Sequence, residues 1–315
     1  MQQNKQVAVL IPCYNESLTI EKVVKDWMKA LPEADVYVYD NNSTDGTAEI
    51  AKNAGAIVRY EYQQGKGNVV RRMFREIDAD CYIMIDGDDT YPAKHGREMV
   101  DLILNKKADM VVGDRLSTTY FQENKRPFHN FGNNLVRTLI NIFFCSDIKD
   151  VMTGCRAFSY EFVKTFPVTS KGFEIETEMT VHAIHKNLKI DNVDVDYKDR
   201  PKGSESKLQT IPDGIRIIKT LLKMFKNYRP IAFFSVLTAI VAFMALGFLT
   251  PTFIECFTTG TFNWTIWTLL GGFFSVSSLQ LLMTGIVLNT IASKERRDFE
   301  LSLQEVSARR GKKND

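Results

Sequence analysis

The sequence predicts an α/β protein built on a parallel, doubly wound sheet, followed by two membrane-spanning helices. Short apolar runs typical of buried strands alternate with helical periodicity along residues 7–112, as in a parallel sheet with helices on both faces. Residues 230–293, in contrast, contain one charged side chain, Glu255. The chain has 315 residues, 44% of them hydrophobic and 25% charged, so we expect one or two domains.

Charge and cysteine content narrow the class of protein. The net charge of +2 is too small to indicate a nucleic-acid partner. The polar start, Met1–Gln6, lacks the long apolar region of a signal peptide. The five cysteines are scattered and form no CxxC pair, which favours a reducing compartment without disulfides or a zinc site.

Strands and helices are expected in alternation. The first strand, Val7–Ile11, is expected to stop at Pro12, and Asn15 or Ser17 can cap the following helix. Its apolar positions recur with a period of about 3.6 residues as far as Leu31. Further strands are predicted at 36–39, 56–60, 82–85, 110–112 and 193–197, and a helix at 97–104.

Three of these strands end in polar clusters, at Pro12–Glu16, Asp40–Asp45 and Asp86–Asp89. Ligands of doubly wound sheets bind beyond the carboxyl ends of the strands, so we expect the clusters to line one crevice. Asp86 and Asp88 point to the same side of an extended segment, and Gly87 leaves room between them. Such hard oxygen donors suit Mg²⁺ or Mn²⁺ with phosphate oxygens completing the shell. The alternative is a solvated acidic loop, which the position at a third ligand-bearing strand end disfavours.

Gly65-Lys66-Gly67 places a flexible backbone and one cation at the start of a predicted helix. A helix N-terminus of this kind favours an anion such as a diphosphate. The alternative is a solvated turn, for which the same three residues are equally suitable. The chain has no GxxxxGK[ST] loop, and no GxGxxG follows the first strand. The sequence therefore indicates a nucleotide site without the signatures of a kinase, ATPase or dehydrogenase.

Four segments, taken in order, resemble the motifs of glycosyltransferase family 2: Val9–Glu16, Asp40–Thr47, Gly65–Gly67 and Asp86–Asp88. The resemblance covers residues 5–230 and implies a GT-A fold. The length, the C-terminal hairpin and the later motifs resemble the polyprenyl-phosphate glycosyltransferases of that family, the group that includes dolichol-phosphate mannose synthase. The chain departs from the family pattern in one place, because Asn41 stands where a second acid is common.

The resemblance implies roles for individual residues. It places Asp86 and Asp88 at the metal, and it implies a catalytic set of Asp86, Asp88, Asp89, Arg115 and Arg200. Asp89 is expected to orient the acceptor or bind the sugar. The nucleotide-sugar site would comprise Pro12, Tyr14, Glu16, Asp40, Asn42, Lys66, Gly67, Asp86, Gly87 and Asp88. The acceptor phosphate would be held by Arg115, Arg126, Arg200 and Lys207.

Basic side chains in residues 113–207 can converge on a phosphate, since Arg presents a planar fork and Lys a point charge. Ordinary solvated surface is the alternative for any one of them. Arg156 is expected to be structural, paired with Asp150 or with an acid in residues 172–178. Three of those acids alternate and could face one side of an extended piece, either for chemistry or to hold the arginines: Glu174, Glu176 and Glu178.

The C-terminal third predicts a membrane anchor. Residues 211–229 form a basic amphipathic helix suited to an anionic membrane surface, or one that packs on the soluble domain. The apolar stretches 231–249 and 264–292 each reach the roughly 20 residues of a spanning helix; a buried core hairpin is the alternative. The connector 250–263 has no Lys or Arg, whereas both flanks are basic, so we expect both termini in the cytoplasm.

We therefore expect a catalytic domain at 1–210, an interfacial helix at 211–229, a membrane hairpin at 230–293 and a basic cytoplasmic tail at 294–315, with mobility expected for its end, Arg309–Lys313. The expected reaction is metal-dependent, inverting transfer of a hexosyl group from a UDP- or GDP-sugar to undecaprenyl or dolichyl phosphate at the cytoplasmic membrane face. Homo-oligomers remain open. A processive polysaccharide synthase is a rival, but the chain has no QxxRW element. A non-catalytic membrane scaffold on a transferase fold is the other.

Overall fold

The computed structural model describes residues 6–117, 129–201, 203–204, 207, 210–262 and 264–314. It comprises two compact units. The first contains Met1–Leu221 and Leu301–Asp315, and the second contains Leu222–Glu300.

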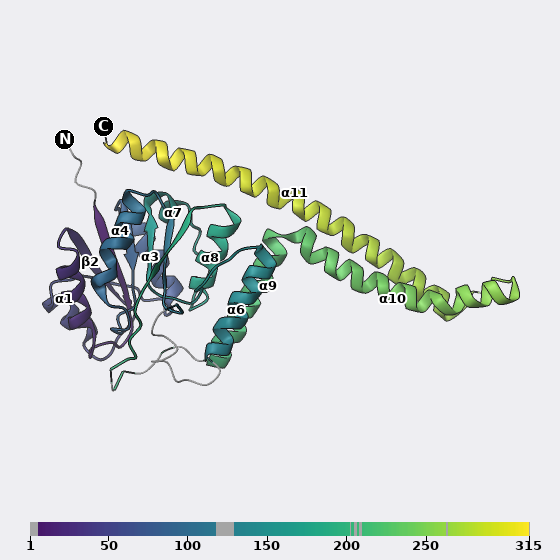
Figure 1. Ribbon diagram of the computed structural model, residues 1–315, viewed down its shortest axis with the longest axis horizontal. Helices are drawn as coiled ribbons and strands as arrows, with labels where there is room; N and C mark the ends of the chain where they lie inside the picture. Colours follow the sequence, from purple (N-terminus) through teal and green to yellow (C-terminus); the bar gives the residue numbers. More distant parts are fainter. Residues whose placement is uncertain are drawn as a thin grey trace. The chain divides into compact units, whose positions relative to one another are not determined.

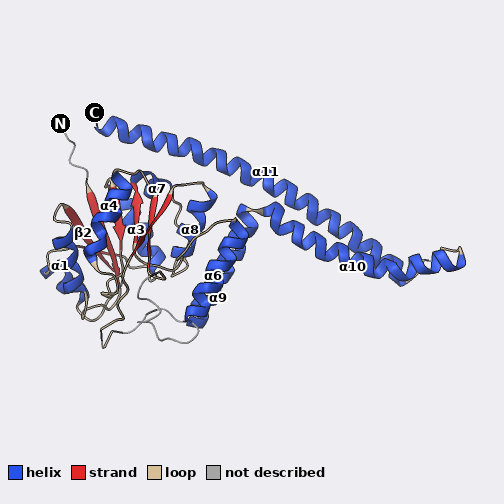
Figure 2. Ribbon diagram, viewed as in Figure 1, coloured by secondary structure: helices blue, strands red, loops and turns tan. Residues whose placement is uncertain are grey.

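The first unit is organised around a seven-stranded sheet with the order β3-β2-β1-β4-β6-β5-β7 (Figure 2). The strands β1 to β5 and β7 pair in parallel wherever they are neighbours, but β6 runs antiparallel to both β4 and β5. The expectation of a wholly parallel sheet is therefore wrong at β6, and the sheet is mixed. The strands are β1 (Val7–Cys13), β2 (Ala34–Asp40), β3 (Ile57–Tyr60), β4 (Cys81–Met84), β5 (Met110–Asp114), β6 (Arg156–Ser159) and β7 (Ile190–Asp194).

Helices cover both faces of this sheet (Figure 1). One apolar core joins the sheet to α1, α2 and α4, with Trp27 and Ile20 fully buried. The other core joins it to α3, α7 and α8 and contains the stacked rings of Phe158 and Phe162. The helices of this unit are α1 (Ile20–Ala30), α2 (Thr47–Asn53), α3 (Lys66–Glu76), α4 (Gly96–Leu104), α6 (His129–Phe144), α7 (Tyr160–Thr165) and α8 (Ile175–His185), with a 3₁₀ turn η1 (Ala93–His95).

Two local expectations are wrong for identifiable reasons. β1 continues past Pro12 to Cys13, with Pro12 opposite Tyr39 of β2. β4 pairs with β1 only as far as Leu10, so at Pro12 the strand has a neighbour on one side only. A proline is tolerated there because its missing N–H interrupts no hydrogen bond to β4. The acids at 174–178 do not lie on an extended piece, since Glu176 and Glu178 are in the first turn of α8. Residues two positions apart in a helix are rotated by about 200° around its axis. Glu176 and Glu178 therefore point in nearly opposite directions and have different partners.

Helix α9 (Thr210–Tyr228) presents apolar side chains in two directions. Ile217, Leu221 and Met224 are buried, while Ile215 and Leu222, which belong to the predicted apolar face, are exposed. The buried stripe fits a helix packed on protein, and the exposed residues leave a second apolar strip beside it.

The second unit is dominated by two long apolar helices, α10 (Pro230–Thr259) and α11 (Ile266–Asn314). Both are long and apolar enough to cross a membrane, and only 6% and 11% of their most apolar windows are buried. Such low burial disfavours a buried core hairpin. α10 extends beyond the predicted span, with Pro251 inside it.

The C-terminal segment is helical rather than an unstructured tail, because α11 continues to Asn314. Its last part belongs to the first unit. There Arg310 forms ion pairs with Asp80, at 2.5 Å, and with Glu161, at 2.9 Å.

Candidate active site

The segments that follow β1, β2 and β4 meet at the carboxyl edge of the sheet. The backbone N–H of Asn15 donates to Ser43 Oγ at 2.9 Å, and that of Glu16 donates to Thr47 Oγ1 at 2.9 Å. Thr19 Oγ1 donates to the carbonyl of Gly87 at 2.6 Å. These bonds join the three polar clusters into one site.

Asp40, at the end of β2, is 4% exposed and has one unsatisfied oxygen. Its Oδ2 accepts the N–H of Ser43 at 3.1 Å. Its Oδ1 is buried and has no hydrogen-bond partner among the residues that the structure describes. A buried carboxylate oxygen without a donor is unfavourable, so this atom is positioned to accept a hydrogen bond from a ligand.

Asn41 explains the departure from the two-acid pattern. Its Nδ2 donates to the carbonyls of Glu61, at 2.7 Å, and Gln63, at 3.0 Å, and its Oδ1 accepts the N–H of Gly65 at 2.7 Å. An ionised aspartate has no donor and would lose the first two bonds. Asn41 therefore anchors the loop that leads to Gly65. Its neighbour Asn42 is exposed and donates to the Tyr62 carbonyl.

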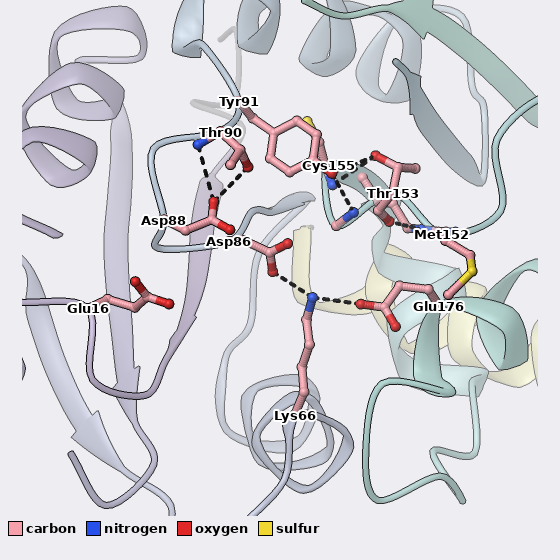
Figure 3. Close-up of polar contacts among 12 residues, drawn as sticks. Glu16, Lys66, Asp86, Asp88, Thr90, Tyr91, Met152, Thr153, Cys155 and Glu176 are labelled. Carbon is pink, nitrogen blue, oxygen red and sulfur yellow. Dashed lines mark hydrogen bonds and ion pairs between the residues drawn. The ribbon is translucent and has the colours of Figure 1, made fainter. Parts of the chain in front are cut away.

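Lys66 lies between two carboxylates, as Figure 3 shows. Its Nζ is 2.5 Å from Asp86 Oδ1 and 2.6 Å from Glu176 Oε1. Burial alone would lower the pKa of Lys66, but Asp86 and Glu176 together raise it above its ordinary value. Burial has the opposite effect on a carboxyl group and would raise the pKa of Asp86. The charge of Lys66 outweighs burial and holds the pKa of Asp86 below its usual range. Both groups are therefore charged.

Asp88 is held by hydrogen bonds on one oxygen and by an ion pair on the other. Oδ1 accepts from Thr90 N at 3.2 Å and Thr90 Oγ1 at 2.6 Å, and Oδ2 is 2.5 Å from Arg200 NH2. Arg200 NH1 also lies 3.5 Å from Glu16 Oε1. Burial and the charge of Asp86 raise the pKa of Asp88. Burial raises the pKa of Glu16 to about 7, although Arg200 opposes the shift.

At two positions beside these carboxylates the packing leaves no room for a side chain. A Cβ on Gly154 would overlap Asp86 Oδ2, and one on Gly87 would lie 2.7 Å from Cys13 Sγ. The Gly154 N–H donates to the hydroxyl of Tyr91 at 3.1 Å. The segment before β6 therefore packs directly against the acidic cluster.

Arg115 lies behind this cluster. It is 6% exposed, its Nε donates to Asp150 Oδ2 at 2.8 Å, and its NH2 donates to the Met152 carbonyl at 2.9 Å. Asp150 thus pairs with Arg115, and the described part of the chain shows no ion pair of Arg156 with either expected partner, Asp150 or an acid in residues 172–178. Arg156 is fully buried and instead donates to the carbonyls of Thr153 and Val151 and to Thr180 Oγ1.

The remaining predicted site residues are more dispersed. Asp89 forms an ion pair with Lys22 at 2.6 Å. Tyr14 is 38% exposed, and Lys207 is near enough to Glu16 to lower its pKa. Gly67 lies in the first turn of α3, where its N–H donates to the Lys171 carbonyl at 3.0 Å. Arg126 lies outside the described residues.

The carboxylates fit a divalent cation that is completed by other ligands. The described part of the chain holds no group of three or more His, Cys, Asp or Glu arranged around a metal position. Asp86 and Asp88 would therefore contribute the protein ligands, with diphosphate oxygens and water supplying the rest, as Mg²⁺ and Mn²⁺ sites commonly do. The mutual repulsion that raises the pKa of Asp88 is what a cation would relieve.

Sequence reasoning did not assign Glu176, Gly154 or Tyr91 to the site. Glu176 was noticed but without a partner, because its strand-like alternation hid its place in a helix. Gly154 lies between Asp150 and Arg156, the two residues that the sequence offers as a structural pair. A glycine directly before the short run at 155–158 is the signal for close approach that could have identified it.

Comparison with known proteins identifies the family. The model of glycosyl transferase family 2 matches residues 8–166. Glycosyltransferase AglJ of Haloferax volcanii is 32% identical over 303 residues, covering 93% of this chain and 96% of that protein. A dolichyl-phosphate hexose transferase of the same organism is 28% identical over 218 residues, covering 69% and 93%.

The fold has solved counterparts. Glucosyl-3-phosphoglycerate synthase from Mycobacterium tuberculosis, crystallised with Mn²⁺, UDP and glucosyl-3-phosphoglycerate, matches with a TM-score of 0.56 and 21% identity, covering 70% of this chain and 80% of that one. At this identity the likeness shows the fold. Together with the family match over half the chain, the mixed sheet and its polar carboxyl edge identify a GT-A glycosyltransferase: the chain belongs to glycosyl transferase family 2.

Proposed function

We propose that this glycosyltransferase transfers a hexosyl group from a nucleotide diphosphate sugar to a polyprenyl phosphate at the cytoplasmic face of a membrane, with inversion at the anomeric carbon. The observation that carries the proposal is the pairing of Lys66 with Asp86 and of Arg200 with Asp88 at one sheet edge. Two carboxylates and two cations at one place suit a divalent metal ion flanked by the phosphate groups of a donor and of an acceptor.

The donor nucleoside would lie beside β1 and β2. Asp40 Oδ1, buried and without a partner among the described residues, would accept a hydrogen bond from a base N–H or a ribose hydroxyl. Pro12, Tyr14, Glu16 and Asn42 would flank it. We favour a UDP-sugar, because the structural counterpart was crystallised with UDP; UDP-glucose, UDP-N-acetylglucosamine and GDP-mannose are all candidates.

Asp86 and Asp88 would hold the metal ion, with Gly87 leaving space between them. Bound there, Mg²⁺ or Mn²⁺ would neutralise charge on the departing diphosphate. Lys66 and the N-terminus of α3, with Gly67 in its first turn, would bind the diphosphate oxygens. These residues would orient the donor and stabilise the negative charge that leaves with it.

The acceptor phosphate would approach from the side of Arg200 and Lys207. A phosphate monoester has its second pKa at roughly 6 and is largely dianionic near neutral pH, so its oxygen needs no strong general base. The fork of Arg115 is engaged by Asp150 and Met152, so we assign Arg115 the role of adding positive charge behind Asp86. Arg126 and Asp89 remain candidates for the acceptor side.

Membrane association places the acceptor within reach. We propose that α10 and α11 span the membrane, with both termini and the first unit in the cytoplasm. The exposed apolar strip of α9, Ile215 and Leu222, has exposed cations beside it, Arg216 and Lys219. This combination suits an anionic lipid surface. The dolichyl-phosphate hexose transferase relative supports a lipid-phosphate acceptor.

The proposal is tested with membranes that contain the protein. They are incubated with labelled UDP-glucose, UDP-N-acetylglucosamine or GDP-mannose plus Mn²⁺ or Mg²⁺, and label is followed into the lipid-phosphate fraction. We expect transfer from one donor, lost in Asp86→Asn and Asp88→Asn. The matched control Glu21→Gln removes an exposed carboxylate that pairs with Lys25 and should leave transfer unchanged.

A second variant separates acceptor from donor. Arg200→Ala should lower the use of lipid phosphate more than the binding of nucleotide. Equal loss of both would contradict its assignment to the acceptor. Label that appears in a polymer rather than in a lipid phosphate would favour a polysaccharide synthase, and the absence of transfer from every donor would contradict the proposed function.

A further inference from the structure

Lys66 has one positive charge and two carboxylate partners, and only one of them belongs to the proposed metal site. Asp86 Oδ1 and Glu176 Oε1 lie at 2.5 and 2.6 Å from the same Nζ (Figure 3). The side chain of Lys66 is 9% exposed and that of Glu176 is 6% exposed, while that of Asp86 is 28% exposed. Glu176 is therefore the interior partner, and Asp86 is the partner that faces the site.

Glu176 is held by its helix rather than by a mobile loop. It lies in the first turn of α8, between Ile175 and Thr177, which have no exposed surface. The ring of Phe173 lies 6.0 Å from Lys66 Nζ and closes another side of the ammonium group. The position of the Lys66 charge is therefore fixed from the side of α8.

This arrangement has a consequence for the metal ligand. A buried ammonium whose one anionic partner is Asp86 would hold that carboxylate strongly, because leaving a buried charge unpaired is costly. A cation that binds Asp86 would then have to displace Lys66 from its partner. Glu176 gives Lys66 a second anionic partner at 2.6 Å. Lys66 therefore stays paired when Asp86 binds the metal ion.

We propose that Glu176 is a positioning residue that shares Lys66 with Asp86 and thereby keeps Asp86 available as a metal ligand. The inference rests on the proposed function, in which Asp86 and Asp88 bind a metal ion together with the donor diphosphate. It assigns Glu176 no contact with substrate. Glu176 acts through Lys66, so an experiment can test whether the effect of Glu176 on metal binding depends on Lys66.

Neighbouring acids on the same element provide matched controls. Glu174 precedes α8 and accepts hydrogen bonds from the backbone N–H groups of Lys171 and Gly172, at 3.3 Å each. Glu174→Gln removes the same charge two residues away without removing a partner of Lys66. An effect of general negative charge would appear in both variants, whereas an effect through Lys66 would appear in Glu176→Gln alone.

The experiment measures binding of Mn²⁺ to the full-length protein in detergent, in the presence of UDP and, in parallel, of GDP, from the decrease of the free-ion signal in electron paramagnetic resonance. Glu176→Gln should weaken Mn²⁺ binding by about thirtyfold or more, the low end of what truncating one partner of a buried charge pair does. Glu174→Gln should stay within about twofold. Circular dichroism verifies that each variant is folded.

A double-mutant cycle distinguishes positioning from a general structural effect. Glu176→Gln should weaken Mn²⁺ binding when Lys66 is present and should add nothing in the Lys66→Met background. Glu176→Asp keeps the charge and should restore part of the affinity; it also replaces Glu176→Gln in the cycle should the latter not fold.

Three results would overturn the inference. The first is an unchanged Mn²⁺ affinity in Glu176→Gln. The second is a loss of Mn²⁺ affinity in Glu174→Gln as large as that in Glu176→Gln. The third is a loss of Mn²⁺ affinity from Glu176→Gln that is the same in the presence and in the absence of Lys66. If the unaltered protein binds no Mn²⁺ with either nucleotide, the proposed metal–nucleotide site fails, and the inference fails with it. Normal binding by the unaltered protein separates the two cases.

Discussion

Gly154 shows how one residue outside the acidic motif can determine where a proposed metal ligand, Asp86, lies. Its Cα is so close to Asp86 that an added Cβ would overlap Oδ2 and lie 2.6 Å from Cγ. The Gly154 N–H is fixed by Tyr91 at 3.1 Å, and its neighbours Thr153 and Cys155 are buried. The backbone therefore has little freedom to retreat, and the carboxylate would have to move.

We predict that Gly154→Ala displaces Asp86 and weakens binding of Mn²⁺ with UDP or GDP by roughly tenfold or more, since misplacing one charge-assisted contact costs about 1.5–3 kcal/mol. Gly132→Ala is the control, because a Cβ there meets no atom within 4 Å. Titration of free Mn²⁺ gives both affinities. Equal affinity in Gly154→Ala and the unaltered protein would mean that Asp86 does not contribute to the metal site.

His182 predicts a pH dependence of stability that is independent of the metal site. It lies in α8 against the rings of Phe162 and Phe166, at 5.9 and 5.0 Å between centroids. Burial lowers the pKa of His182 to about 3, and the nearby Lys186 and His185 act in the same direction. Between its ordinary pKa of 6.5 and about 3, the unfolded chain binds a proton that the folded chain does not, so stability falls as pH falls through this window.

At pH 4 this linkage should lower the free energy of unfolding by roughly 2–3 kcal/mol relative to pH 7. His182→Leu removes the titrating group while keeping an apolar side chain between the two rings. We expect the difference in thermal midpoint between pH 7 and pH 4 to be smaller in His182→Leu than in the unaltered protein. Identical pH profiles would show that His182 is protonated in the folded state.

Single residues of the site differed in how far the sequence predicted them. Asp86 and Asp88 could be assigned to the candidate site because they follow the third of three strands that end in polar clusters, which favoured a metal site over a solvated acidic loop. Glu176 could not be assigned, because its partner Lys66 lies 110 positions earlier in the chain and α8 brings them together. The pairing of Arg115 with Asp150 was equally invisible, since two arginines and several acids allowed many pairings of similar plausibility.

At the scale of elements, α8 supports the glycine turn that opens α3. Glu178 accepts hydrogen bonds from the N–H and the hydroxyl of Thr169 and from the N–H of Ser170, the last at 2.8 Å. The carbonyls of Ser170 and Lys171 in turn lie where a Cβ on Gly67 or Gly65 would be. The backbone at 169–171 thus depends on Glu178, and the turn around Lys66 packs on that backbone.

We predict that Glu178→Ala loosens this support. The N–H groups of Thr169 and Ser170 would lose their acceptor, and because Ser170 is buried, its unsatisfied N–H alone would cost about 1–3 kcal/mol. Both the thermal midpoint and the affinity for UDP or GDP should fall. Glu49→Ala, which removes an exposed glutamate of α2, should change neither by a measurable amount. A loss of stability without any loss of nucleotide affinity would show that the glycine turn does not depend on residues 169–171.

The order of elements was predictable as far as β5, because periodicity and strand-end punctuation agree along that part of the chain. β6 was not, since Arg156-Ala157-Phe158-Ser159 is short and begins with an arginine that is buried by tertiary contacts alone. The reversal of that strand makes the sheet mixed. It also brings the turn before β6, with Gly154, onto the acidic cluster, so the part of the fold that was missed is also part of the site.

At the scale of the whole molecule, the division into a catalytic unit and an apolar hairpin was evident from charge alone. The exposed surfaces of α10 and α11 agree with it, since large apolar side chains such as Phe243 and Leu246 are exposed along α10. The C-terminal segment was harder to predict. Residues 301–315 are basic and polar, which suggested mobility, but they continue α11, and Arg310 pairs with Asp80 and Glu161 in the first unit.

Two native cysteines allow the proposed topology to be tested with conservative changes. Cys145 follows α6 in the first unit, and Cys256 lies in the last turn of α10, where its carbonyl accepts the N–H of Gly260. Both are exposed, whereas the other three cysteines are buried. Cys145→Ser and Cys256→Ser therefore each leave one accessible thiol, on opposite sides of the first proposed span.

We predict that a membrane-impermeant maleimide added to intact cells labels Cys256 in Cys145→Ser but does not label Cys145 in Cys256→Ser. Inverted membrane vesicles should give the reverse result. The physical reason is that the short connector at 260–265 has no Lys or Arg and follows a helix long enough to cross the bilayer. Detergent-permeabilised cells, in which both thiols should react, provide the control for accessibility. Labelling of both thiols from the same side would show that α10 does not span the membrane, and the catalytic site would then have to reach the proposed lipid acceptor by interfacial contact alone.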